Sequence, residues 1–262
     1  MPPTDQLDPD KIKANLNTRR IGRQVVVYSS TSSTNDVASE YARNTDNDGL
    51  VIFAEEQTAG RGRGGNIWHS YRGESILCSV VLTRNRLDAE LLSLACAVSV
   101  ATGLGKVGAD QASIKWPNDI LLNGKKVAGI LVESKSGDRA GVCVVGIGVN
   151  CHQTRDCFGA ELRPKATSID IESRTVCDRT TVARRLLTSL EHWLEVAEKD
   201  SRAVTDQWSA LSVQLGHRVR LNCDRQEFAG NCIGVDPQEG LVLQLDAGGV
   251  RMFPAAHTTI IK

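Results

Sequence analysis

Hydrophobic residues follow two kinds of pattern along the chain up to residue 211. Continuous runs of β-branched and aliphatic residues predict buried strands at 24–28, 50–56, 75–83 and 140–150. Apolar residues at helical spacing predict helices at 8–20, 88–104, 180–199 and 202–211, with a shorter one beginning after Ser33. Strands and helices therefore alternate along this part of the chain.

The pattern changes near residue 213, where short apolar segments are separated by turn residues. The stretches GHRVRL, EFAGNCIGV, GLVLQL and RMFPAAHTTII predict four or five short strands. A β domain of about 50 residues buries little surface on its own, so we expect it to pack on the rest of the chain. The predicted boundaries are 1–212 for the large domain and 213–262 for the small one.

A hairpin is predicted where Asn123-Gly124 separates two apolar runs. A two-residue turn pairs Leu121 with Lys126 and Asp119 with Ala128, which places these four side chains on one face. Asp119 and Lys126 are then diagonal neighbours, within reach of one small ligand. The competing interpretation is an edge strand whose charges discourage aggregation.

The segment GRGRGG at 60–65 combines glycines with two arginines. Glycine gives a ligand access to backbone amides, and the arginine guanidinium matches a carboxylate or a phosphate, so the composition suits a loop that closes on an anion. The same composition is typical of a solvated surface loop or of a basic nucleic-acid patch. Trp68, just beyond, fits either stacking on a base or anchoring in the core.

Hydroxyl and amide side chains gather in STSSTNDVA at 30–38. At a helix N-terminus such groups can bind a polar ligand, and the helix dipole favours negative charge. The alternative is that they only cap the helix.

Composition narrows the function classes. The chain has 31 Lys+Arg and 31 Asp+Glu, so no global basic field collects nucleic acid. Eight cysteines without a CxxC pair, a polar N-terminus and the lack of a long apolar stretch predict a cytoplasmic protein with buried thiols and no membrane span. The histidines show no ligand spacing, so the sequence predicts no metal site.

The three polar stretches resemble the catalytic domain of biotin protein ligases, the enzymes that join biotin to a lysine of a carrier protein. The resemblance covers about residues 25–150 and rests on STN at 33–35, QTAGRGRG at 57–64, KWPND at 115–119, KKVAGIL at 125–131 and GIGVN at 146–150. It implies an α+β fold: a mixed sheet flanked by helices, similar to the core of class II aminoacyl-tRNA synthetases, followed by a small SH3-like β-barrel.

The resemblance also implies roles for individual residues. Those expected to bind the ureido ring of biotin are Ser33, Thr34, Asn35 and Gln57. Others expected to line the biotin site are Arg61, Gly62, Arg63, Lys126 and Gly129. The adenylate is expected to contact Arg61, Arg63, Trp68, Asn118, Lys126 and Asn150. The expected catalytic residues are Lys126 and Arg61, which reach the reacting oxygens, and Asp119, placed near the incoming lysine.

One position departs from the family pattern. The family's loop usually reads GRGRRG, whereas Gly64 stands here where the second adjacent arginine is expected. Arg61 and Arg63 are both present, so the departure bears only on how tightly the loop retains the adenylate intermediate.

The implied reaction uses biotin and Mg-ATP as substrates. It forms biotinyl-5'-AMP and transfers biotin to a lysine of a biotin carboxyl carrier protein domain. A lipoate or octanoate ligase or transferase of the same fold is the alternative enzyme, and a biotin- or nucleotide-responsive regulator is the non-enzymatic one. The short segment before the first predicted strand leaves no room for an N-terminal DNA-binding domain, so we expect the monofunctional type that binds no DNA. A homodimer formed through sheet edges, as in similar enzymes, is a further expectation.

Overall fold

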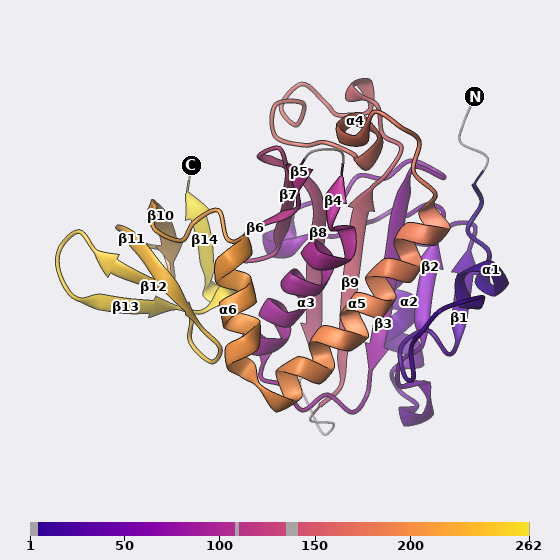
Figure 1. Cartoon of the computed structure of the whole chain (residues 1–262), viewed down its shortest axis with the longest axis horizontal. Coiled ribbons are helices and arrows are strands. Elements are labelled where there is room, and N and C mark those ends of the chain that lie inside the picture. Colours follow the sequence, from indigo (N-terminus) through magenta and orange to yellow (C-terminus); the bar gives the residue numbers. More distant parts are fainter. Residues whose placement is uncertain (1–4, 108–109, 135–140, 262) are drawn as a thin grey trace.

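The computed structural model describes residues 5–107, 110–134 and 141–261. Its large part is a mixed seven-stranded sheet (Figure 1). The strands are β1 (Val25–Tyr28), β2 (Val51–Ala54), β3 (Ser75–Leu82), β6 (Ser113–Lys115), β7 (Asp119–Leu122), β8 (Lys125–Ser134) and β9 (Cys143–Asn150). They lie in the order β1-β2-β3-β9-β8-β7-β6, with β1 and β2 parallel and every other neighbouring pair antiparallel. A separate pair, β4 (Lys106–Val107) and β5 (Asp110–Gln111), is antiparallel.

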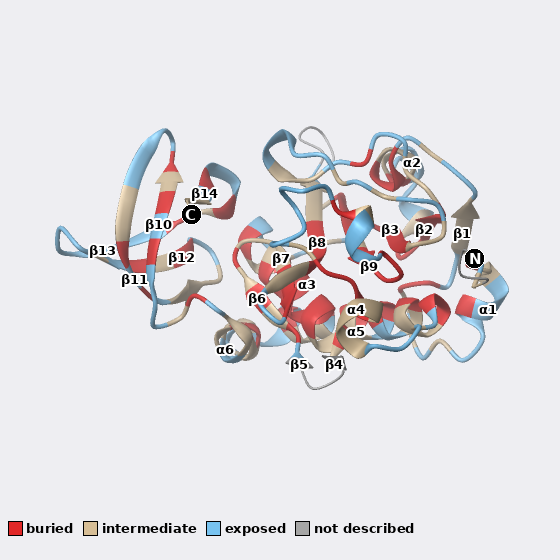
Figure 2. Ribbon diagram, turned by 90° about the horizontal axis from the view of Figure 1, so that it is seen from above, coloured by how far each residue is buried: buried red, intermediate tan, exposed pale blue. Residues whose placement is uncertain are grey.

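Helices cover both faces of the large sheet. They are α1 (Pro9–Lys13), α2 (Thr34–Tyr41), α3 (Ala89–Leu104), α4 (Ile169–Ser173), α5 (Arg179–Lys199) and α6 (Ser201–Leu211). Helices α3 and α5 pack together on one face, while α2 lies on the other (Figure 2). The mixed sheet with flanking helices expected from the resemblance is confirmed. No helix in the described part of the chain is long and apolar enough to cross a membrane.

The core is divided between the two faces. The larger cluster lies under α3 and α5 and contains Phe53, Trp116 and Trp208, each 1% exposed or less. The smaller cluster lies under α2, where Ala38 and Ala42 meet Ile52 and Val144. Because successive strand residues point to opposite faces, the continuous apolar runs of β2, β3 and β9 supply both clusters.

The hairpin register differs from the prediction beyond its second pair. Leu122 pairs with Lys125 and Leu121 with Lys126, as expected for the turn at Asn123-Gly124. Asp119, however, pairs with Gly129 and not with Ala128, because a β-bulge places one extra residue, Val127, in β8. Ala128 now pairs with Ile120 and leaves the predicted common face, whereas Asp119, Leu121 and Lys126 still share it.

The first helix is shorter than the predicted 8–20 segment. It begins at Pro9, with Asp8 accepting backbone N–H donors as its cap, and it ends at Lys13. Ala14 has an extended backbone and Asn15 lies in the left-handed region with φ 63°, so the helix cannot continue.

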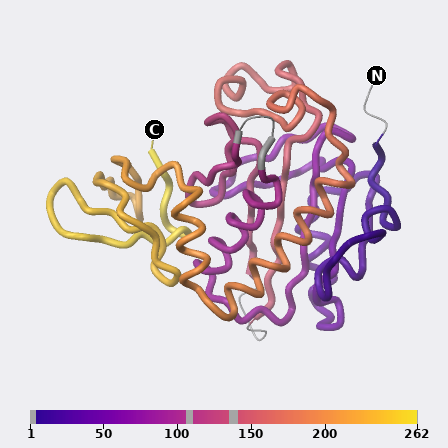
Figure 3. The backbone as a smooth tube through the Cα atoms, in the orientation of Figure 1, coloured from indigo at the N-terminus to yellow at the C-terminus, as the bar shows by residue number. Residues whose placement is uncertain are grey.

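The C-terminal part, the yellow end of the tube in Figure 3, is a five-stranded antiparallel sheet. Its strands are β10 (Arg218–Cys223), β11 (Gln226–Asp236), β12 (Gly240–Leu245), β13 (Val250–Phe253) and β14 (Thr258–Ile261), in the order β13-β12-β11-β10-β14. The Val213 amide donates to the Ile114 carbonyl, and Gln214 Oε1 accepts from the Trp116 amide at 2.6 Å. The small sheet is therefore joined to the edge of the large one, as its size led us to expect.

Candidate active site

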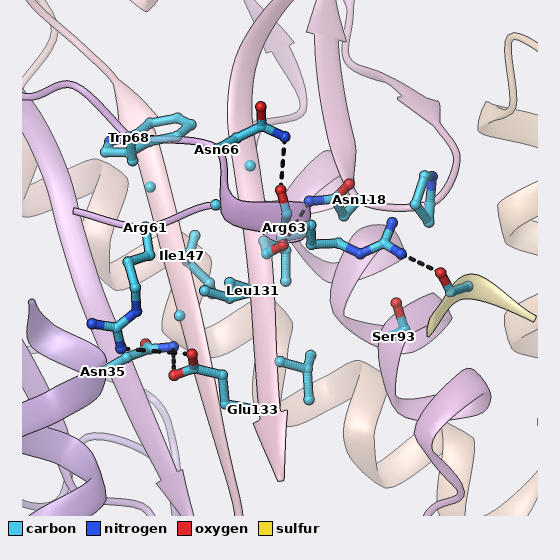
Figure 4. A pocket seen from close by; sticks show the side chains of 18 of the residues that line it. Asn35, Arg61, Arg63, Asn66, Trp68, Ser93, Asn118, Leu131, Glu133 and Ile147 are labelled. Carbon is cyan, nitrogen blue, oxygen red and sulfur yellow. Dashed lines mark hydrogen bonds and ion pairs between the residues drawn. The ribbon is translucent and has the colours of Figure 1, made fainter. Parts of the chain in front are cut away.

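A cavity of about 1640 Å³ opens on the α2 side of the large sheet. Three polar stretches that are far apart in the sequence line it: the start of α2, the loop 57–68 and the hairpin of β7 and β8 (Figure 4). Strand pairing explains why two of these stretches lie side by side. Parallel β1 and β2 are continued by a bridge between Thr31 and Gln57, which brings both ends to the same edge of the sheet.

Thr34 and Gln57 form the first polar group of the cavity. Gln57 Oε1 accepts from the Thr34 amide at 2.7 Å and from the Thr34 hydroxyl at 2.9 Å. Ser33 occupies the predicted N-cap position of α2, but its side chain makes no capping hydrogen bond. The cap-only interpretation of this stretch therefore does not hold, since Ser33 and Thr34 line the cavity instead.

Asn35 is held in one orientation from both ends of its amide. The buried Ser79 hydroxyl lies 2.6 Å from Asn35 Oδ1 and 2.7 Å from the Thr34 hydroxyl, and Asn35 Nδ2 donates to Glu133 Oε2 at 2.7 Å. Gly146 passes so close that a Cβ there would lie 2.4 Å from Asn35 Oδ1. Only glycine leaves room for this amide.

Arg61 lies at the same end of the cavity as Asn35. It makes a two-point contact with Asp36, at 3.0 Å and 2.6 Å, and its Nη2 is 3.6 Å from Glu133 Oε1. The hydrogen bonds from Arg61 hold the pKa of Asp36 below its usual value, and the same pair raises the pKa of Arg61. Arg61 is thus paired with carboxylates of the protein in this structure.

Arg63 points away from Arg61, toward the small sheet (Figure 4). It donates to the Ala255 carbonyl, and burial lowers its pKa. Glu90, at the start of α3, accepts from the Ala255 amide at 2.6 Å, and burial raises the pKa of this carboxyl. One segment of the small sheet therefore contacts both the glycine-rich loop and α3.

Two paired glycines form a flat floor in the cavity. Gly129 of β8 lies opposite Gly148 of β9, and the Trp68 ring covers both. A Cβ on Gly148 would lie 2.6 Å from this ring, and one on Gly129 would lie 3.0 Å from it. Trp68 is half-buried, and its Nε1 is buried without a hydrogen-bond partner among the residues that the structure describes. It therefore lines the cavity and is not a core anchor.

Lys126 stands beside this floor. Its Nζ is 2.5 Å from Asp119 Oδ1 and 5.5 Å from the centroid of the Trp68 ring. The predicted proximity of Lys126 and Asp119 is confirmed even though the register is not, because the bulge at Val127 still leaves both side chains at the cavity. Both side chains are partly shielded from solvent, at 34% and 24% exposure, unlike those of a solvated edge strand.

The remaining predicted residues differ in their placement. Gly62 lines the cavity, and so does Asn118, whose amide donates to the Ile130 carbonyl at 2.8 Å. Asn150 is not part of the cavity lining that the described residues define, and its amide donates to the Thr167 carbonyl at 2.9 Å. In the described structure Asn150 therefore fixes the segment at Thr167 and does not contribute to the cavity wall.

Four residues of the site were not singled out from the sequence: Ser79, Glu133, Gly146 and Gly148. The two glycines alternate in GIGVN with apolar residues, which in a strand means that one face carries no side chain. This alternation is a usable signal. Nothing in the sequence around Ser79 or Glu133 indicates that Asn35 lies against them.

Comparisons with known proteins identify relatives of the whole chain. The profile of the Biotin/lipoate A/B protein ligase family matches residues 27–150. The biotin–[acetyl-CoA-carboxylase] ligase of Mycobacterium tuberculosis is 33% identical over 269 residues, which cover 98% of this chain and 97% of that protein. The enzyme of the same description from Paracoccus denitrificans is 34% identical, with 87% and 96% covered.

Two further relatives extend the comparison. The bifunctional ligase/repressor BirA of Bacillus subtilis is 32% identical over 95% of this chain and 78% of its own length. The biotin protein ligase from Aquifex aeolicus, solved in complex with biotin and ATP, has the same fold, with a TM-score of 0.78 at 24% identity over 92% of this chain and 99% of that one. Full-length similarity to ligases of one specificity, together with the converging motifs, assigns the chain to the biotin protein ligases of the Biotin/lipoate A/B protein ligase family.

Proposed function

We propose that the protein forms biotinyl-5'-AMP from biotin and Mg-ATP and then transfers biotin to a lysine of a biotin carboxyl carrier domain. The observation that carries the proposal is the division of one cavity into two ends. One end contains the hydroxyl and amide groups of Thr34, Asn35 and Gln57, with the Arg61–Glu133 ion pair beside Asn35, and the other end contains Lys126 and Asp119. An elongated ligand with a polar ring at one end and a carboxylate at the other matches this division.

The end with Thr34, Asn35 and Gln57 suits a cyclic urea. Such a ring presents one carbonyl acceptor and two N–H donors, and the amides of Asn35 and Gln57 offer both complementary functions. Their orientation is already fixed by Ser79, Glu133 and Thr34, so little side-chain entropy is lost on binding. The glycine floor at Gly129 and Gly148 gives a flat ligand room, which requires the Trp68 ring to move aside.

The end with Lys126 and Asp119 suits the activation of a carboxylate. Attack of the biotin carboxylate on the α-phosphate of Mg-ATP releases pyrophosphate and brings negative oxygens together. Lys126 supplies a positive charge there, and Arg61 and Arg63 add to it if loop closure takes them from Asp36 and Ala255. The closed loop would also keep water from the mixed anhydride.

The second step needs an unprotonated lysine amine. We propose that Asp119 orients the incoming ε-amine of the carrier domain or accepts its proton. This role requires Asp119 to exchange its 2.5 Å contact with Lys126 for one with the acceptor. The amine then attacks the acyl carbon, and AMP leaves with the bonding electrons.

The test measures pyrophosphate release and bound biotinyl adenylate with biotin and ATP in the absence of a carrier. We expect Lys126→Ala and Arg61→Ala to abolish both, whereas Lys125→Ala, the neighbouring hairpin lysine outside the cavity lining, retains them. Normal biotin-dependent pyrophosphate release by either site variant would refute its role. If lipoate or octanoate supports the reaction and biotin does not, the alternative acyl specificity replaces this proposal.

The partner assignments are part of the same proposal. We propose that the boundary between the two domains falls at residues 212 and 213, that Mg²⁺ arrives with ATP, that the protein binds no DNA, and that it can form a homodimer through its sheet edges. Sedimentation of the full chain with and without biotin and ATP tests the dimer, and a mobility-shift assay at low salt tests the DNA assignment.

A further inference from the structure

A second cluster of chemically active side chains lies outside the cavity. It combines His152, Asp170 and Cys177, whose candidate ligand atoms all lie within 4.8 Å of one another. The three come from different parts of the fold: His152 follows β9, Asp170 lies in α4, and Cys177 precedes α5. The sequence spacing gave no ligand set, since only the tertiary fold brings these residues together.

A fourth donor is adjacent. The Cys151 thiol borders the three-residue cluster, because Cys177 interacts with both Cys151 and His152: the contact with Cys151 raises the pKa of the Cys177 thiol and the contact with His152 lowers it. His152 Nδ1 is 2.7 Å from Asp170 Oδ2, and the His152 side chain is only 2% exposed. Two sulfurs, one nitrogen and one oxygen form a donor set that zinc binds tetrahedrally, with metal–ligand bonds of about 2.0–2.3 Å.

The histidine also has the outer partner that metal-binding histidines usually have. Its second nitrogen, Nε2, is 3.2 Å from Asp5 Oδ2. A carboxylate on the far nitrogen fixes the ring and leaves Nδ1 to face the metal. Asp5 is itself paired with Arg179, at 2.8 Å, and this guanidinium also contacts Glu55. The carboxylate behind His152 is therefore held in place by an ion pair.

The other buried thiols have different surroundings. Cys78 and Cys96 lie fully buried in the apolar core. Such thiols act as small hydrophobic side chains. The contact with Cys151 and burial raise the pKa of Cys177 as well, so its neighbours and not its pKa distinguish it: Cys177 stands beside an imidazole and a carboxylate, with Cys151 next to it.

We propose that Cys151, His152, Asp170 and Cys177 form a structural site for a soft divalent cation, of which zinc is the fitting one. His152 would bind through Nδ1, giving up its hydrogen bond to Asp170, and each thiol would bind as a thiolate. Each thiol releases one proton on binding, and Nδ1 gives up its proton where it carries one. None of the four residues belongs to the cavity lining formed by the described part of the chain, so the site is separate from that of the proposed ligation.

The expected effect is on the architecture around the site. Binding would join the end of β9, α4 and the start of α5 with one ion, and through Asp5 it would hold the N-terminal segment against them. A ligand that binds only the folded state raises its stability. We therefore expect added zinc to raise the melting temperature of the apoprotein.

The experiment uses the full chain, reduced with a thiol-free phosphine, stripped with EDTA and desalted. Titration with Zn²⁺ is expected to reach close to one equivalent per chain. Titration with Co²⁺ is expected to give a thiolate-to-cobalt charge-transfer band and the intense visible bands of a tetrahedral site. Failure to bind zinc, or a cobalt spectrum without the thiolate band, overturns the proposal.

Variants locate the site. Cys177→Ser and His152→Asn are expected to lose stoichiometric zinc, while Cys157→Ser, a half-buried thiol outside the cluster, retains it. Cys151→Ser tests the fourth ligand if the first two variants fail to fold, and it is expected to weaken the charge-transfer band by about half. Equal loss of metal in Cys157→Ser overturns the assignment. So does unreduced protein that binds no metal and contains a disulfide between Cys151 and Cys177.

Discussion

The two faces of the large sheet are built from the same strands but differ in what they pack against. Toward α3 and α5, β9 presents Val145 and Val149 to a continuous apolar core. Toward α2 and the loop 57–68, the same strand presents Gly146 and Gly148 to a polar cavity. Stability is thus concentrated on one side of β9 and ligand binding on the other.

This difference follows from the two-residue period of a strand. A substitution on the core face changes packing, whereas one on the cavity face changes the shape and polarity of the site, although the two positions are neighbours in sequence. Substitutions of the two kinds should therefore affect different measurements.

The largest expected effect is on the core face. Phe53 is fully buried in the larger cluster. Phe53→Ala is expected to lower the free energy of unfolding by about 3–5 kcal/mol, through lost burial and the cavity left behind. Urea denaturation measures this change. Under conditions in which the variant is folded, biotin-dependent pyrophosphate release should be close to that of the parent chain, and a selective loss of turnover would contradict the separation of the faces.

The next effect is on the cavity face of β9. Gly146→Ala places a methyl group where Asn35 Oδ1 lies, 2.4 Å away, and displaces an amide held by Ser79 and Glu133. We expect biotin-dependent activity to fall by at least about 100-fold, because a displacement of about 1 Å in a binding group has that consequence. Gly234→Ala in β11, with open space around its Cβ, is the matched control and should leave activity unchanged.

The sequence predicted those parts of the fold that depend on local chemistry. The strands at β2, β3 and β9 and the helices α3, α5 and α6 were found because their apolar patterns are long and regular. The bulge at Val127 was missed, since a hairpin turn fixes the register only next to the turn. The length of α1 was misjudged because Asn15, which ends the helix in a left-handed conformation, was not recognised as a stop signal.

For the candidate site, the sequence predicted residues that line the cavity but not the residues that hold them in place. Resemblance of motifs indicated that Thr34, Gln57 and Lys126 converge, and the structure brings them to one cavity. The resemblance could not indicate which residues hold these side chains, because Ser79 and Glu133 lie on strands whose apolar patterns predict only burial. Which side chain faces which across the space between α2 and the sheet is a property of tertiary packing.

A smaller effect is expected at Ser79, whose hydroxyl joins Thr34 to Asn35. Ser79→Ala removes about one buried hydrogen bond, worth about 1 kcal/mol, so we expect the KM for biotin to rise by about 5–10-fold with kcat less affected. The control is Ser99→Ala on the core face, a buried serine whose hydroxyl donates to the Cys96 carbonyl. If both variants change KM equally, Ser79 acts through general destabilisation and does not position the binding group.

The smallest effect is expected at the rim of the cavity, where Arg61 meets Asp36. Both side chains are more than 40% exposed, so solvent screens the pair, and Asp36→Asn should change the free energy of unfolding at about pH 7 by less than about 1 kcal/mol. Arg61 holds the pKa of Asp36 below 3.8. The contribution of the pair is therefore present above pH 3.8 and is lost as the pH falls through the lowered pKa.

Comparing unfolding of the parent chain and Asp36→Asn across this acid range isolates the contribution, because the difference between them should disappear at the lowest pH. The same variant frees Arg61 from one of its two carboxylate partners, leaving Glu133. If Asp36 holds Arg61 away from the ligand, the variant should bind biotin with a slightly lower KM. A higher KM would instead mean that Asp36 orients Arg61 for binding, and the rim would then belong functionally with the cavity face.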